Sequence, residues 1–175
     1  MKKALYIHGL NSDKHSVTGN KVKNVLQVYD YLTVLKTFHV LTPIKTKIEI
    51  EELLSKEHFD LIIGHSLGGF YAFVLPFNKK ILINPCLKPQ DEAKKFEDVP
   101  RRLVTEFEKL EEETLLNKTE DVFGLFGTHD ELFSYATLFK SYYGNCYKML
   151  ECGHKPDEES LKEGMSIALK SLKLV

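Results

Sequence analysis

The segment with the clearest capacity for chemistry is the run Gly64-His65-Ser66-Leu67-Gly68. Apolar residues precede it at 61–63 and continue from it through 67–73. An order of strand, sharp turn and short helix is the setting in which a serine is held out from the backbone as a nucleophile. Gly64 and Gly68 are needed because larger side chains would collide with the neighbouring strand and helix. The alternative interpretation is a tight turn whose serine only caps the helix.

A serine hydroxyl needs a base that removes its proton before it attacks an acyl group. After this kind of turn, an acid and then a histidine are expected along the chain. Asp130 follows the apolar stretch 122–126, and His154 follows the stretch 147–150. Both lie just beyond the C-terminal ends of predicted strands, where an open α/β sheet forms its ligand crevice. We therefore predict that Ser66, Asp130 and His154 form a catalytic triad, in which Asp130 orients the imidazole.

Other histidines and acids leave alternatives open. The competing histidines are His8, His65 and His129. His65 adjoins the serine, so its ring should point away, and the tether of His129 is too short to span the serine and the acid. The acids that could replace Asp130 are Asp91, Glu131 and Asp157.

An acyl-transfer site also needs two N–H donors for the oxyanion of the tetrahedral intermediate. One should be the amide of Leu67, which follows the nucleophile at the start of the predicted helix. The second should be the amide of Leu10, because His8-Gly9 after the buried stretch 4–7 permits close approach of the backbone. A plain glycine turn is the alternative interpretation there. The residues expected to support the site are His8, Gly9, Gly64, His65 and Gly68.

The elements that must position these residues alternate between short apolar runs and longer helical patterns. Strands are predicted at 4–7, 38–41, 61–63, 81–83, 122–126 and 147–150. Helices are predicted at 18–29, 48–56, 67–73, 134–143 and 158–172. Apolar runs of this length are typical of parallel strands that are buried on both faces. The fold class is therefore α/β, a doubly wound and mostly parallel sheet with helices on both faces.

The segment 86–120 breaks this alternation. It is rich in Lys and Glu, and Pro89 and Pro100 interrupt it. Its apolar residues could form the inner face of one or two helices, namely Phe96, Val99, Leu103, Phe107 and Leu110. The segment is either a crossover helix or a small cap over a pocket.

Composition limits the function classes. The chain has 175 residues, which predicts a single domain over 1–175, and its formal net charge of −1 gives no field that would hold nucleic acid. The apolar run 4–7 is too short for a signal peptide, and no run approaches the roughly 18 residues of a membrane span. Three cysteines without a CxxC pair suggest neither a disulfide framework nor zinc. We expect a cytoplasmic protein that binds neither nucleic acid nor membranes.

The sequence contains no phosphate-loop, dinucleotide-binding or zinc-protease motif, so no cofactor or metal is expected. The chain instead resembles the α/β-hydrolase superfamily and, more narrowly, the small YqiA/YcfP-like bacterial esterases. The likeness rests on 6–12, 64–69, 83–89, Asp130-Glu131 with Tyr135, and the strand that leads to His154. The Asn-Pro block within 83–89 is the more family-specific part.

This resemblance implies a minimal α/β-hydrolase fold with strand order 2-1-3-4-5-6, the same triad, and activity on short acyl esters. The expected partner is a small-molecule acyl ester, and a thioester is an alternative. Two further alternatives are a binding or scaffold protein that retains the fold without catalysis, and a peptidase or acyltransferase with the same triad.

Overall fold

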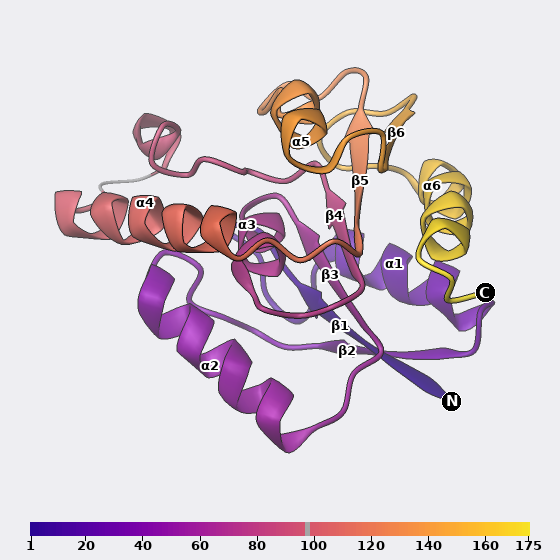
Figure 1. Ribbon diagram of the computed structural model, residues 1–175. Coiled ribbons are helices and arrows are strands. Elements are labelled where there is room, and N and C mark those ends of the chain that lie inside the picture. Colours follow the sequence, from indigo (N-terminus) through magenta and orange to yellow (C-terminus); the bar gives the residue numbers. More distant parts are fainter. Residues whose placement is uncertain (97–98) are drawn as a thin grey trace.

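The computed structural model describes residues 1–96 and 99–175, which contain a six-stranded parallel sheet in the order β2-β1-β3-β4-β5-β6 (Figure 1). The strands are β1 (Lys2–Ile7), β2 (Tyr31–Leu35), β3 (Leu61–His65), β4 (Lys80–Ile83), β5 (Val122–Gly127) and β6 (Tyr147–Leu150). The chain adds β2 on one side of β1 and then adds β3 and the later strands on the other side, so the strand order reverses between β1 and β3. A ligand crevice is expected at this reversal, at the carboxyl ends of the strands.

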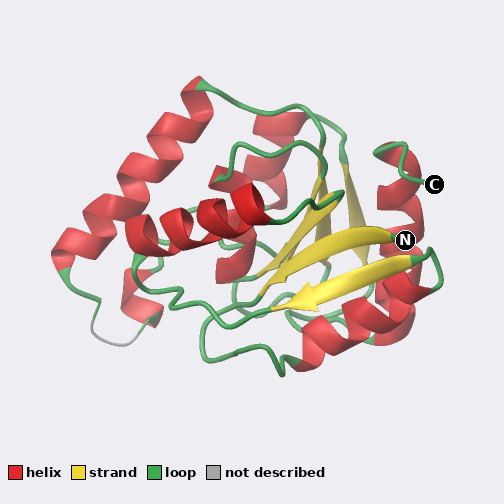
Figure 2. Cartoon of the chain, turned by 90° about the horizontal axis from the view of Figure 1, so that it is seen from below, coloured by secondary structure: helices red, strands yellow, loops and turns green. Residues whose placement is uncertain are grey.

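Helices cover both faces of the sheet, as Figure 2 shows with the sheet seen between them. The helices are α1 (Val17–Gln27), α2 (Pro43–Lys56), α3 (Leu67–Val74), α4 (Arg101–Leu116), α5 (Ala136–Tyr143) and α6 (Glu158–Ser171), with a short 3₁₀ helix η1 (Ala93–Lys95). α1 and α6 lie side by side on one face, and α2, α3, α4 and α5 bring apolar side chains to the core on the other. This arrangement confirms the doubly wound α/β class. None of the helices in the described ranges is long and apolar enough to cross a membrane.

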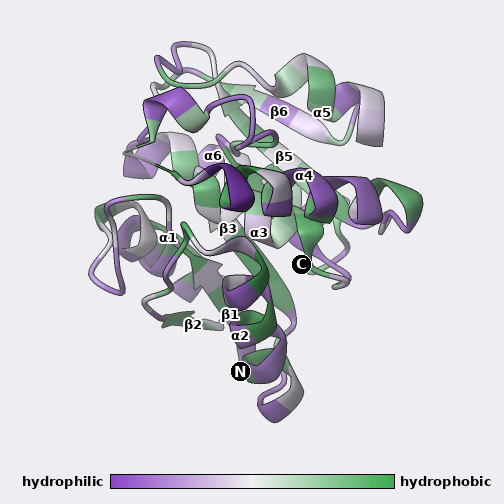
Figure 3. Ribbon diagram, turned by 90° about the vertical axis from the view of Figure 1, so that its left-hand side faces the viewer, coloured by the Kyte–Doolittle hydropathy of each residue, from purple (hydrophilic) through white to green (hydrophobic). Residues whose placement is uncertain are grey.

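The core consists of two apolar clusters, one on each face of the sheet. Val22, Leu26 and Met165 represent the cluster under α1 and α6, and Ile50 and Phe107 represent the other. Figure 3 shows the central strands coloured mainly as hydrophobic, whereas α4 alternates between the two colours along its length. The strands are apolar on both sides because helices pack against both faces of the sheet.

The prediction of a strand at 38–41 is wrong, whereas the other five predicted strands are present. β2 is formed by 31–35 instead, with Tyr31 opposite Lys2 in β1. The sequence pattern does not separate the two segments, because each holds one polar residue among apolar ones, Thr33 in 31–35 and His39 in 38–41, and only the pairing with β1 distinguishes them. The amide of Phe38 donates to Nε2 of His8 at 2.9 Å, so this segment joins a loop and not the sheet.

The segment 86–120 contains η1 and α4, and residues 97 and 98 lie outside the described residues. α4 packs against α2 and α3 as a crossover helix and buries Phe107 and Leu110. The part before η1 is held to the rest of the fold, because the side chain of Gln90 donates to the buried Glu111. Tyr135 also donates to Glu92 at 2.8 Å.

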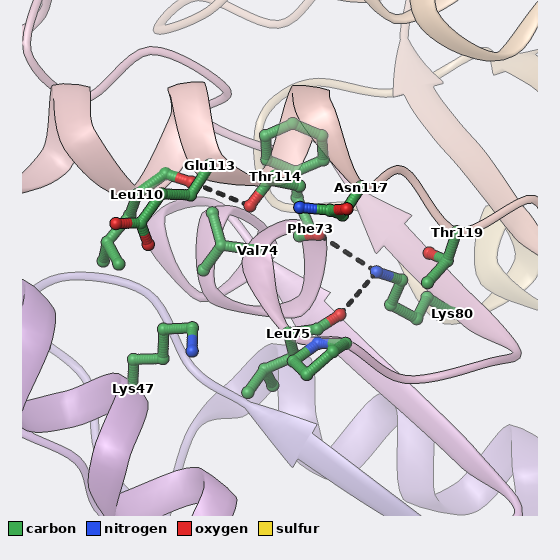
Figure 4. Close-up of a pocket in the computed structure, with 11 residues that line it drawn as sticks. Lys47, Phe73, Val74, Leu75, Lys80, Leu110, Glu113, Thr114, Asn117 and Thr119 are labelled. Carbon is green, nitrogen blue, oxygen red and sulfur yellow. Dashed lines mark hydrogen bonds between the residues drawn. The ribbon is translucent and has the colours of Figure 1, made fainter.

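Lys80, the first residue of β4, has its ammonium group inside the protein (Figure 4). Its Nζ donates to the carbonyl oxygens of Phe73 at 3.0 Å and Leu75 at 2.8 Å, at the C-terminal end of α3. The residue lines a cavity of about 170 Å³ at the end of β4 that is opposite to Ile83. Burial lowers the pKa of Lys80 to about 7. Burying a charged ammonium group costs free energy. The hydrogen bonds to the end of α3 offset part of that cost, because the helix leaves these carbonyl oxygens without partners.

This burial predicts that the free energy of unfolding rises with pH between about 7 and 10. Over that range Lys80 has lost its proton in the folded protein, whereas a lysine in the unfolded chain keeps it to about pH 10.4. The contribution is at most about 1.4 kcal/mol per pH unit. Urea titrations across this range should show a steeper rise for the wild type than for Lys80→Met. Equal slopes would contradict the prediction.

Candidate active site

Ser66 lies in the sharp turn between β3 and α3, with φ 57° and ψ −123°. Such a conformation is strained for a residue with a side chain and is typically kept where function requires it. The Ser66 side chain makes no capping hydrogen bond to α3, although the residue occupies the position before the first helical turn. The interpretation of this serine as a helix cap is therefore wrong, and its hydroxyl is available to other partners.

The two glycines of the motif are required by close backbone approaches. A Cβ atom on Gly64 would lie 2.2 Å from the carbonyl oxygen of Gly68. A Cβ atom on Gly68 would lie 2.1 Å from the carbonyl oxygen of Ile7. Both distances are far shorter than any real contact, and the atoms concerned are backbone atoms that cannot turn aside. The collisions expected from the sequence are thus present, and they involve β1 as well as α3.

The imidazole of His154 lies between Ser66 and Asp130. Its Nε2 is 3.0 Å from Oγ of Ser66, and its Nδ1 is 3.0 Å from both carboxylate oxygens of Asp130. With Nδ1 donating to the carboxylate, Nε2 is left to accept the serine proton. His154 is 3% exposed and Ser66 9%, so the hydrogen bonds between these residues are largely removed from competing water. The sheet thus brings together three residues from the carboxyl ends of three strands.

The carboxylate of Asp130 is held by its own loop. One of its oxygens accepts from the amides of Leu132 at 2.8 Å and Phe133 at 3.0 Å. Burial by itself would raise the pKa of Asp130, but the hydrogen bonds from His154 and from these two amides outweigh it, and the pKa lies below its usual value. The carboxylate therefore stays ionised opposite the imidazole at neutral pH.

The competing acids and His129 occupy other positions. Asp157 caps α6 by accepting from the amide of Ser160, and Asp91 lies in an exposed turn with its amide bonded to Lys88. Glu131 is close to the site, but its carboxylate accepts from the backbone amide of His154 at 3.0 Å and not from the ring. The His129 side chain is 70% exposed and pairs with the side chain of Glu151. Among the described residues, only Asp130 has a carboxylate in hydrogen-bonding range of the His154 ring.

His65 does not point away from the site, contrary to the expectation from the sequence. Its ring centroid is 5.0 Å from that of His154, and its Nε2 lies 2.9 Å from the carbonyl oxygen of His154. A carbonyl only accepts, so this nitrogen carries the proton. Burial and the nearby His154 lower the pKa of His65 to about 4. His65 is therefore neutral at neutral pH and acts as a hydrogen-bond donor to the backbone.

The loop after β1 passes directly beside Ser66. A Cβ atom on Gly9 would lie 2.9 Å from Cβ of Ser66, so only glycine allows this approach. The buried ring of His8 fixes the loop: its Nδ1 donates to the carbonyl of Gly9 at 2.7 Å, and its Nε2 accepts from Phe38. Burial lowers the pKa of His8, which favours this neutral form. The loop continues into Leu10, which lines the same cavity as the serine.

Asn84, which the sequence motifs did not single out as a site residue, lies at the centre of the polar network. Its side-chain amide donates to the carbonyls of Gly153 at 3.0 Å and His154 at 2.9 Å. Its side-chain oxygen accepts from the amide of Gly127 at 2.6 Å. The available signal was the Asn-Pro pair directly after an apolar strand, since asparagine is favoured where φ is positive, here 41°.

A cavity of about 670 Å³ is lined by both Ser66 and His154. One side is the mainly polar loop after β1 together with the first two residues of α1, Val17 and Thr18, and the other carries Phe96, Leu132 and Phe133. The ring of Phe133 stands edge-on to His154, with centroids 5.2 Å apart. The cavity is therefore large enough for a small organic molecule and has both polar and apolar walls.

This sheet order, with a serine turn after β3 and an acid and a histidine after later strands, defines the α/β-hydrolase fold class. The chain belongs to the uncharacterised protein family UPF0227, whose model matches residues 3–159. This membership agrees with the resemblance seen in the sequence, because that resemblance rested on blocks within the same range. No curated protein matches the chain significantly.

Solved structures share the fold at low sequence identity. Est1E from Butyrivibrio proteoclasticus is 18% identical, with a TM-score of 0.74 over 97% of this chain and 88% of that chain. A substrate-bound structure of FphF, a fluorophosphonate-binding serine hydrolase of Staphylococcus aureus, is 13% identical, with a TM-score of 0.70 over 98% and 83%. The Pyrococcus furiosus esterase Pf2001 is 16% identical, with a TM-score of 0.65 over 97% and 82%. These similarities establish the fold.

The close approach at Gly68 predicts that Gly68→Ala destabilises the protein by about 3 kcal/mol, the upper end of the cost of overpacking. Gly153→Ala is the matched control, because Gly153 has no positive φ and its Cβ atom would meet only the end of the Glu131 side chain at 3.1 Å and the His129 carbonyl at 3.6 Å. Its loss of stability should be at most about 1 kcal/mol, since the end of a flexible side chain can move aside. Urea unfolding of the two variants compares these effects. Equal losses of stability in the two variants would contradict the prediction, because they would show that the Ile7 carbonyl can move away from the added Cβ atom.

Proposed function

We propose that the protein is a serine hydrolase that cleaves carboxylic esters through an acyl-serine intermediate. The observation that carries this proposal is the position of the His154 imidazole, within 3.0 Å of both the Ser66 hydroxyl and the Asp130 carboxylate. That geometry supports the proposed roles, in which Ser66 is the nucleophile, His154 the general base and Asp130 the group that orients the base.

In the first step, Oγ of Ser66 forms a bond to the ester carbonyl carbon while its proton passes to Nε2 of His154. The ionised Asp130 stabilises the resulting imidazolium without taking the proton. The tetrahedral intermediate then breaks its bond to the alcohol oxygen, which receives the proton from His154. A water molecule attacks the acyl-serine in the same way, and the acid is released as Ser66 regains its proton.

The oxyanion of each tetrahedral intermediate needs donors on the side of Ser66 opposite the imidazole. The amide of Leu67 is the first of α3, so no carbonyl within the helix accepts from it and the helix dipole favours negative charge there. The amide of Leu10 follows Gly9, whose backbone passes against the Ser66 side chain. We propose these two amides as the oxyanion hole, as the sequence suggested.

The cavity supports a small acyl ester as substrate. Its volume of about 670 Å³ holds a short acyl group together with its alcohol, and Phe96, Leu132 and Phe133 supply an apolar wall for one of them. A thioester would fit the same space, since the attack on the carbonyl carbon is unchanged. Est1E has also been solved with ferulic acid bound, which shows that the fold accommodates an aromatic acid in that protein.

If His154 activates Ser66, the protein should be labelled covalently by a fluorophosphonate probe, which reacts with an activated serine. Wild-type protein should label, and Ser66→Ala should not. On p-nitrophenyl acetate, kcat of Ser66→Ala should fall by roughly 10³-fold or more, to the level that binding and the oxyanion hole supply.

Ser55→Ala is the matched control, because Ser55 is exposed in α2 and bonds only within that helix. It should label and turn over like the wild type. A wild-type protein that resists the probe would instead indicate a binding or scaffold protein. Turnover by Ser66→Ala at the wild-type rate would exclude this nucleophile.

The ionised carboxylate predicts that Asp130→Asn lowers kcat by about 10⁴-fold, since an amide no longer holds Nδ1 in the donating form. The KM should change little because Asp130 does not line the cavity. Asp157→Asn tests the competing acid, and asparagine still caps α6 there, so this variant should keep wild-type kinetics. Steady-state kinetics of both variants checks this assignment. If Asp157→Asn were the slow variant, Asp157 and not Asp130 would be the acid of the site.

A further inference from the structure

We propose that Asn84 is a positioning residue, which fixes the backbone of residue 154 and thereby aims the imidazole at Ser66; this inference rests on the proposed function. Asn84 is 2% exposed and does not line the cavity, so its action on the reaction is through His154 and not through the substrate. The hydrogen bonds responsible for this action meet at the peptide groups on either side of His154.

The Asn84 side chain links the loops that carry the acid and the base. Its NH₂ group donates to the carbonyls of Gly153 and His154, and its oxygen accepts from the amide of Gly127 at the end of β5. Asp130 follows Gly127 by three residues, and His154 follows Gly153 directly. A single buried amide thus sets the separation of the two loops whose side chains must meet.

The backbone of residue 154 is held from both sides. Its carbonyl oxygen accepts from Asn84 and from Nε2 of His65, each at 2.9 Å, and its amide donates to Glu131 at 3.0 Å. The direction of the side chain is set by these peptide planes, because Cβ leaves the same Cα. The imidazole is therefore aimed before any contact with Ser66 or Asp130 is made.

Asn84 is in turn fixed to the nucleophile. The amide of Ser66 donates to the carbonyl of Ile83 at 3.0 Å, and the carbonyl of Ser66 accepts from the amide of Cys86 at 3.0 Å. These bonds lie on the two sides of Asn84 in the chain. The side chain that holds His154 and the turn that holds Ser66 therefore share one stretch of backbone, which keeps their relative position constant.

Asparagine suits this position for two separate reasons, and they can be tested separately. Its φ of 41° lies in the left-handed region, which asparagine and glycine tolerate better than other residues. Its side chain then supplies both donors and the acceptor. Asn84→Gly keeps the backbone conformation and removes every side-chain bond. Asn84→Asp keeps the shape and the acceptor for Gly127 but places an oxygen against two carbonyl oxygens.

The test is the second-order rate constant for fluorophosphonate labelling, measured with full-length protein together with proton NMR of the His154 Nδ1–H. A displacement of the imidazole by about 1 Å costs on the order of 10²-fold. We expect Asn84→Gly and Asn84→Asp to label at least about tenfold more slowly than the wild type. We also expect their downfield Nδ1–H resonance to shift or broaden, since a fluctuating imidazole leaves the Asp130 carboxylate.

Ile50→Val is the control for a general loss of stability, because Ile50 is buried in α2 and lies outside the cavity lining. It should lower the melting temperature but keep the wild-type labelling rate and resonance. If Asn84→Gly does not fold, Asn84→Asp decides the matter alone. Folded variants that label within about twofold of the wild type and keep the resonance would overturn the inference.

The two proposals fail in different ways. A wild-type protein that the probe does not label contradicts the proposed function, while the NMR comparison still shows whether Asn84 holds His154. A wild type that labels at Ser66, with Asn84 variants that label equally fast, contradicts the positioning role alone.

Discussion

The hydrogen bond between Nε2 of His154 and Oγ of Ser66 joins residues that are 88 positions apart, and much of the fold is arranged around it. Such a bond needs both partners to be fixed by something other than the bond itself, since one neutral hydrogen bond contributes only about 1 kcal/mol. The parallel sheet supplies this by bringing the carboxyl ends of β3, β5 and β6 to one edge. The strained turn at Ser66 and the network around Asn84 then set the final distances.

The site combines an ionised carboxylate, Asp130, with a neutral histidine, His65. Asp130 keeps a lowered pKa because two amides and the imidazole bond to it. His65 is neutral because burial and the adjacent His154 lower its pKa to about 4. A charged His65 would repel an imidazolium only 5.0 Å away, so its neutrality leaves His154 free to accept a proton. The sequence places the two histidines 89 positions apart, and only the fold makes one relevant to the other.

Much of the fold and the core of the site could be predicted from the sequence. The glycines, the serine and the apolar strands have strong local signals, so the turn at Ser66 and the positions of Asp130 and His154 follow from chain order and sheet geometry. β2 was missed because 31–35 and 38–41 each hold one polar residue among apolar ones, so the pattern alone did not show which of them pairs with β1. The true direction of His65 was missed because its partner is a backbone carbonyl of a distant loop, which leaves no trace in side-chain patterns. Asn84 left one signal, the Asn-Pro pair after an apolar strand, but that pair does not indicate the distant backbone groups that its side chain holds.

The attachment of the Ser66 turn to Ile83 and Cys86 has a consequence for how this fold can diversify. Among the described residues, the hydrogen bonds that align Ser66, Asp130 and His154 are made by the stretch up to Cys86 and by the loops after β5 and β6. The described residues between Cys86 and β5 contribute η1, α4 and the cavity-lining residues Lys95 and Phe96, but none of those bonds. Changes around Lys95 and Phe96 would therefore alter the lining of the cavity without removing the bonds that align Ser66, Asp130 and His154, whereas Phe107 and Leu110 of α4 are buried in the core. The turn around η1 is the part of this scaffold most open to evolutionary change.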